Sequence, residues 1–78
     1  MKIRKEIMDF AEVMEKVMRV NDAKKGNSWK TLSLGYLEDK MGEQWDEWFP
    51  TPSKAKTVDV ANYCMMLFHR YDEIQEIE

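Results

Sequence analysis

The segment from Val58 to Tyr71 is the part of this sequence that most constrains how the chain can fold. On a helical wheel its apolar side chains fall into two adjacent rows, Val60-Cys64-Leu67-Tyr71 and Ala61-Met65-Phe68. Together the rows cover about half of the helix circumference, which is wider than the ~100° apolar stripe of an ordinary surface helix. A helix of this kind is expected to occupy a central position, with other helices packed on several sides.

The chain is too short to provide all of that cover from within. It has 78 residues, and a domain of this size buries only about 60–65% of the surface that its unfolded chain exposes. Small domains commonly compensate with disulfides, a metal or a second subunit. Cys64 is the only cysteine, so no disulfide can form within the chain, and we predict a buried, reduced thiol. We therefore expect a single domain, residues 1–78, that assembles as a homodimer or higher oligomer.

A first helix is predicted from about residue 3 to residue 20. Its apolar residues recur at helical spacing, and they are Ile3, Ile7, Phe10, Met14 and Val17. Residues 21–30 are predicted to form a loop, because they are rich in Asn, Asp, Gly and Ser, which favour turns. Lys25, Trp29 and Lys30 lie in this predicted loop.

Two further helices are predicted, which makes the fold class all-α with three main helices. The second helix should begin near Thr31 or Ser33, because a hydroxyl side chain can cap a helix N-terminus. Residues 49–52 should end it, since Pro50 and Pro52 each disfavour helix in the residue before. Ser53 should cap the third helix, which is expected to run from about residue 54 to residue 74 or beyond.

Charge and hydropathy exclude several classes of partner. The net charge is −3, with acids and bases interspersed, so the chain lacks the broad positive field that non-specific nucleic-acid binding needs. No segment approaches the ~20 apolar residues that cross a membrane. The N-terminal residues alternate charged and apolar side chains instead of forming a signal peptide. These features predict a cytoplasmic protein that binds neither membrane nor nucleic acid.

Acidic residues on the second and third helices form the first candidate site. Glu43 and Glu47 are four residues apart and should share one helix face, while Asp59 and Asn62 lie near the start of the third helix. Carboxylates on facing helices can form sites for hard cations such as Mg²⁺. The alternative is that these acids form a solvated face and that Asn62 bonds to a neighbouring backbone group. His69, the single histidine, argues against a zinc site.

The predicted loop forms the second candidate site. Lys25 and Lys30 would contact phosphates, and Trp29 would stack on a base. The alternative is a solvated loop in which Trp29 anchors the backbone to the helices. In that case the chain would be a structural helical oligomer.

The order of these residues resembles the small MazG-like proteins. In this sequence Lys25-Gly26 and then Trp29 follow the first helix, an acidic helix comes next, and Asp59-Val60-Ala61-Asn62 opens the apolar helix. The resemblance extends from about Val13 to Met66. It implies an all-α oligomer that hydrolyses nucleoside triphosphates or deoxynucleoside triphosphates to the monophosphate and pyrophosphate. Family members use magnesium, held by one E-x-x-E pair and one E-x-x-D pair.

The resemblance also implies roles for individual residues. Glu43, Glu47 and Asp59 would be the catalytic metal ligands, for Mg²⁺ or Mn²⁺. Gln44 and Lys56 occupy positions where the family has glutamate. A protonated Lys56 cannot bind a metal ion and would repel it.

The nucleotide itself would be bound by Lys25, Trp29, Lys30 and Asn62. The alternative to an enzyme is a non-catalytic descendant that binds a nucleotide or a protein. In such a descendant the Lys56 ammonium group would take the place of the ion and pair with Glu47 and Asp59.

Overall fold

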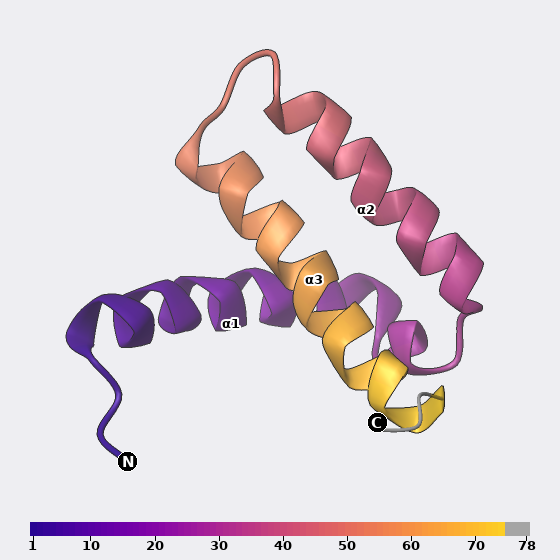
Figure 1. The fold of residues 1–78 in the computed structure, drawn as a ribbon, viewed down its shortest axis with the longest axis horizontal. Helices are drawn as coiled ribbons and strands as arrows, with labels where there is room; N and C mark the ends of the chain where they lie inside the picture. Colours follow the sequence, from indigo (N-terminus) through magenta and orange to yellow (C-terminus); the bar gives the residue numbers. More distant parts are fainter. Residues whose placement is uncertain (75–78) are drawn as a thin grey trace.

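The computed structural model describes residues 1–74, which are almost entirely helical (Figure 1). In chain order the elements are α1 (Lys5–Lys25), the short 3-10 turn η1 (Ser28–Lys30), α2 (Leu34–Trp48) and α3 (Lys54–Ile74). The all-α class with three main helices is confirmed. The predicted extension of the third helix beyond residue 74 lies outside the described residues.

The first helix is longer at its C-terminus than predicted, since residues 21–25 belong to α1 and not to a loop. The helix ends at Gly26, which has φ 64° and whose N–H donates to the Asp22 carbonyl oxygen at 2.9 Å. Glycine adopts this left-handed conformation without the steric cost that a Cβ atom brings. Lys24 and Lys25 in the last turn also interact favourably with the helix dipole, and these effects outweigh the turn preference of Asn21 and Asp22.

The predicted caps of the other two helices are confirmed. The Ser33 hydroxyl accepts a hydrogen bond from the Tyr36 N–H at 3.1 Å, and the Ser53 hydroxyl accepts one from the Lys56 N–H at 3.1 Å. Each bond satisfies one of the backbone N–H groups that the first helical turn leaves without a partner. Because α2 ends at Trp48 and α3 begins at Lys54, the prolines between them set the connection as predicted.

The three helices are not arranged as a parallel bundle. α2 and α3 run side by side as a hairpin, while α1 crosses α3 with its C-terminal half and extends away from both with its N-terminal half (Figure 1). The buried apolar core is small and comprises Leu37, Val58, Met66 and Leu67. Trp29, Leu32 and Met18 are among the half-buried residues packed against it. α3 contacts both other helices, as its wide apolar face predicted.

Cys64 is a correction to the sequence prediction, because its side chain is exposed and not buried. The neighbouring Phe68 is 64% exposed. Within one chain, α1 and α2 cover only part of the wide apolar surface of α3, and these two residues lie on the uncovered part. In the described part of the chain, no helix is both long and apolar enough to cross a bilayer.

Candidate functional site

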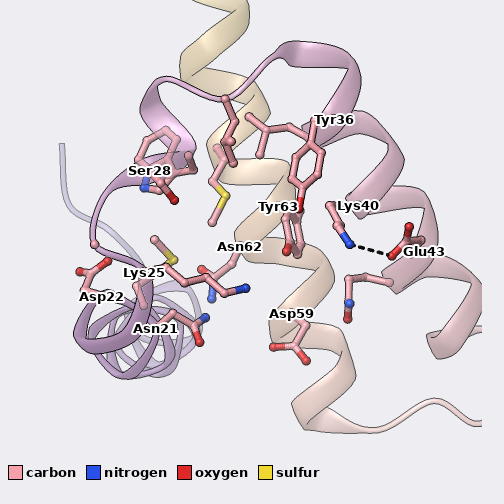
Figure 2. Close-up of a pocket in the computed structure, with 17 residues that line it drawn as sticks. Asn21, Asp22, Lys25, Ser28, Tyr36, Lys40, Glu43, Asp59, Asn62 and Tyr63 are labelled. Atoms are coloured by element: carbon pink, nitrogen blue, oxygen red, sulfur yellow. Dashed lines mark hydrogen bonds and ion pairs between the residues drawn. The ribbon is translucent and has the colours of Figure 1, made fainter.

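A cavity of about 420 Å³ lies where α1, η1, α2 and α3 meet (Figure 2). Its walls combine the last turns of α1, the 3-10 turn, one face of α2 and the first half of α3. It exists because α1 crosses α3 at an angle, which leaves a gap between the end of α1 and the α2–α3 hairpin. The cavity brings together five of the predicted site residues, namely Lys25, Trp29, Glu43, Asp59 and Asn62.

Two of the predicted site residues do not line this cavity. Lys30 lies on the other side of Trp29, with its Nζ atom 5.7 Å from the centre of the indole ring, and it borders a separate shallow hollow with His69 and Arg70. Glu47 lies next to the cavity, close enough for its charge to act on Asp59. The structure therefore brings Glu43 and Asp59, two of the three predicted metal ligands, into the same cavity as most of the predicted nucleotide-binding residues, and leaves Glu47 and Lys30 outside it.

Asn62 is the most deeply buried polar side chain among the described residues, with 3% exposure. Its Nδ2 atom donates a long hydrogen bond of 3.4 Å to the Met14 carbonyl oxygen on α1. Its Oδ1 atom is buried and has no hydrogen-bond partner in the described part of the chain. A buried acceptor without a partner costs about 1–3 kcal/mol. Asn62 also lines the cavity, so an acceptor without a partner belongs to one of the cavity residues.

Trp29 provides the complementary group. Its indole Nε1 is also buried and also lacks a hydrogen-bond partner among the described residues, although a buried tryptophan N–H normally has one. The Arg70 guanidinium donates to the Trp29 carbonyl oxygen at 2.9 Å, which holds the backbone of the 3-10 turn against α3. Trp29 also packs against the buried core, so the predicted anchoring role is present, and the residue lines the cavity as well.

Three cavity residues were given no role by the sequence reasoning. Tyr36, Lys40 and Tyr63 line the cavity (Figure 2). Lys40 Nζ lies 3.3 Å from the Glu43 carboxylate and 5.4 Å from the centre of the Tyr36 ring. Partial burial raises the pKa of the Tyr63 hydroxyl, so this group is a hydrogen-bond donor at neutral pH. The one sequence signal for Tyr36 and Lys40 is their helical spacing, which puts them on the same side of the second helix as Glu43.

The charged groups of the cavity nearly balance. Lys25 and Lys40 contribute two positive charges, and Asp22, Glu43 and Asp59 contribute three carboxylates. Partial burial, and secondly the charge of Glu47, raise the pKa of the Asp59 carboxyl above its ordinary value of 3.8. A strongly negative ligand would therefore be repelled unless a cation or a proton accompanies it.

Lys56 has a structural role that differs from the predicted one. Its Nζ atom donates to the Glu47 carbonyl oxygen at 3.2 Å, to the Thr51 carbonyl oxygen at 3.1 Å and to the Thr51 hydroxyl. In the described chain no ion pair joins Lys56 to the carboxylate of Glu47 or of Asp59. The lysine instead caps the C-terminal end of α2, where a positive charge is favourable.

The described residues do not fit a magnesium ion as they are arranged. Among the side chains that the structure describes, there is no group of three or more Asp, Glu, His or Cys residues that could hold a metal ion. Glu43 faces the cavity but is bonded to Lys40, and Glu47 lies outside the cavity wall. Magnesium is usually held in near-octahedral geometry by one or two carboxylates together with waters and substrate phosphates, and the cavity offers it two of the three predicted carboxylates, one of them bonded to Lys40.

Comparisons with protein-family models, with curated proteins and with solved structures find no match for this chain.

Proposed function

We propose that the cavity binds a nucleotide, with the heterocyclic base held between the indole edge of Trp29 and the amide of Asn62. One observation supports this proposal above all: Trp29, which carries a buried donor without a partner, and Asn62, which carries a buried acceptor without a partner, both line the same cavity. A nucleobase presents both hydrogen-bond donors and acceptors on its edge, together with a flat apolar face. Pockets that combine aromatic walls with a few convergent polar groups are typical ligand sites.

The lysines of the cavity are suited to the phosphate. Lys25 forms no ion pair with another described side chain. The Lys40–Glu43 pair is open to solvent, which screens such ion pairs and makes them weak, so Lys40 can exchange Glu43 for a phosphate at little cost. The three carboxylates limit how much negative charge the cavity tolerates. We therefore expect a nucleoside monophosphate to bind more tightly than the metal-free triphosphate.

Magnesium-dependent pyrophosphate release, which the resemblance to MazG-like proteins implies, remains a prediction from the sequence. It would require Glu43, Glu47 and Asp59 to come together around an ion, whereas Glu43 is bonded to Lys40. We propose the non-catalytic alternative, in which the chain binds a nucleotide without hydrolysing it. The titrations described next, together with an assay of pyrophosphate release, distinguish the hydrolase from the non-catalytic binding protein.

The test is isothermal titration calorimetry with a panel of ribo- and deoxynucleoside mono- and triphosphates, with and without magnesium or manganese. Lys25→Gln should weaken binding about 10-fold or more, because a hydrogen bond to a charged group contributes about 1.5–3 kcal/mol. Lys24→Gln is the matched control, since Lys24 is exposed in the same helical turn and does not line the cavity. Its affinity should equal that of the wild type.

Pyrophosphate release is measured in the same samples. Binding that depends on Lys25, without release, supports the proposal. Metal-dependent release would show that the chain is a hydrolase and that the carboxylates rearrange around the ion. Absence of binding to every nucleotide, by protein with full helical content, would refute a nucleotide site in this cavity.

We also propose that the chain associates with itself. Its accessible surface is 6339 Å², whereas a folded monomer of its mass of 9.4 kDa exposes about 5,000 Å². The excess of about 1,300 Å² exceeds the ~800 Å² that each partner contributes to a standard interface. Sedimentation equilibrium of the full chain tests this, and a monomer at all concentrations would contradict it.

A further inference from the structure

The N-terminal half of α1 is an apolar arm without a partner in the single chain. It extends beyond the α2–α3 hairpin (Figure 1), and no residue of α1 is buried. Its exposed large apolar side chains are Ile7, Met8, Phe10 and Val13, and the exposed Ile3 lies just before the helix. Because isolated helices are only marginally stable in water, a helix such as this one gains most of its stability by packing its apolar face.

A groove of about 660 Å³ runs beside this arm, between α1 and the connection from α2 to α3. The α1 wall is formed by Phe10, Val13 and Val17, and the opposite wall by Trp48, Pro52 and Val58. The Trp48 indole N–H donates to the Thr57 hydroxyl at 2.9 Å. The polar edge of this tryptophan is thus satisfied, so an apolar side chain can occupy the groove without leaving that donor unpaired.

We propose that the groove and the arm receive the α1 helix of a second copy of this chain, in an antiparallel arrangement around a two-fold axis. This inference rests on the proposed self-association and adds its location. In such an interface each copy presents the same surface, so the arm of one chain fills the groove of the other. The excess surface of about 1,300 Å² is sufficient for one partner's share of a stable interface.

The charges of α1 select the antiparallel orientation. Lys2 and Arg4, just before the helix, and Lys5, its first residue, form a basic segment that only Glu6 interrupts at its end, and an acidic segment of Asp9, Glu12 and Glu15 follows. When two copies cross antiparallel near residues 7–10, the basic segment of each lies against the acidic segment of the other. A parallel arrangement in register would place like charges side by side, which is unfavourable.

The groove is separate from the proposed nucleotide cavity. Asp59 is the one residue that lines both, while Lys25, Trp29 and Asn62 lie on the cavity side alone. A second copy in the groove therefore leaves the nucleotide-binding groups uncovered. Substitutions on the groove wall should change association without changing nucleotide affinity, so the two proposals can fail independently.

The first test is sedimentation equilibrium of the full chain and of two glutamate variants. Phe10→Glu should weaken dimerisation about 30-fold or more, which corresponds to losing a central aromatic contact. Val20→Glu is the matched control, because Val20 is exposed on the same helix and does not line the groove. It should leave the dimer dissociation constant nearly unchanged. Circular dichroism confirms that both variants keep their helical content.

The second test locates the interface by cross-linking. Asp9→Cys in a Cys64→Ser background places a thiol near the crossing point, where two Cα atoms can approach within the ~4.4–6.8 Å that a disulfide requires. Oxidation should give a covalent dimer. Ala23→Cys in the same background, near the end of α1, should not.

Each result decides between the proposals. A wild-type monomer refutes both self-association and this interface, and would leave the groove to a different protein. A dimer that Val20→Glu weakens as much as Phe10→Glu, or that Ala23→Cys cross-links instead of Asp9→Cys, refutes the location alone. Selective loss with Phe10→Glu, together with the Asp9→Cys cross-link, supports the antiparallel α1 interface.

Discussion

Replacing Asn62 by leucine should stabilise the free protein and abolish nucleotide binding. The Asn62 Oδ1 atom is buried without a partner, and such an acceptor costs about 1–3 kcal/mol. Its Nδ2 bond to the Met14 carbonyl oxygen is 3.4 Å long, beyond the usual 2.7–3.2 Å range. Losing that bond should therefore cost only about 0.5 kcal/mol, the low end for hydrogen bonds in proteins. Leucine has the same branched arrangement of side-chain heavy atoms, and the extra bulk of its methyl groups can extend toward the adjacent cavity.

The net effect of Asn62→Leu is a gain of about 1 kcal/mol in the free energy of unfolding, which for a domain of this size raises Tm by about 4–8 °C. Urea denaturation followed by circular dichroism measures the first quantity, and calorimetric titration measures nucleotide affinity. Asn21→Leu is the control, because Asn21 also lines the cavity but is exposed, and its stability should be unchanged. A loss of 1 kcal/mol or more with Asn62→Leu would show that the amide serves the fold and not a ligand.

Three further outcomes are expected. Leu37→Ala should destabilise the protein by about 2–5 kcal/mol in urea denaturation, because Leu37 is the most completely buried core side chain. Lys56→Met should cost about 1 kcal/mol by removing the cap of α2, while Lys54→Met should cost little. Partial burial, and secondly the charge of Glu47, raise the pKa of Asp59 in the folded protein. The protonated carboxyl therefore adds to the free energy of unfolding, in full below the ordinary pKa of 3.8, and this contribution is lost as the pH rises through the raised pKa. Asp59→Asn should therefore gain stability relative to the wild type between pH 4 and 7, by at most about 0.5 kcal/mol, because the side chain is only partly buried and solvent screens its charge. A difference in stability that does not grow with pH would contradict this.

The sequence by itself determined the helices, because helix formation depends on short-range features. The spacing of apolar residues, the hydroxyl caps Ser33 and Ser53 and the prolines after Phe49 all act within a few residues of one another. For the same reason the sequence indicated that Lys25 and Trp29 lie near each other. At the end of α1 two short-range signals competed, namely the turn preference of Asn21 and Asp22 and the glycine cap at Gly26. The prediction of a loop followed the turn preference and was wrong, because the cap extends the helix through Asn21 and Asp22.

Only the tertiary structure decided what those residues do. The Asn62 amide contacts the Met14 carbonyl oxygen, 48 residues earlier in the sequence, and whether its second polar atom finds a partner depends on how α1 crosses α3. The same crossing leaves Cys64 exposed and creates both the cavity and the groove. The direction of Lys56, toward the end of α2 and away from the carboxylates, depends on the close return of α3 after the prolines. Such features arise from the angles between helices, which apolar spacing along a single helix does not specify.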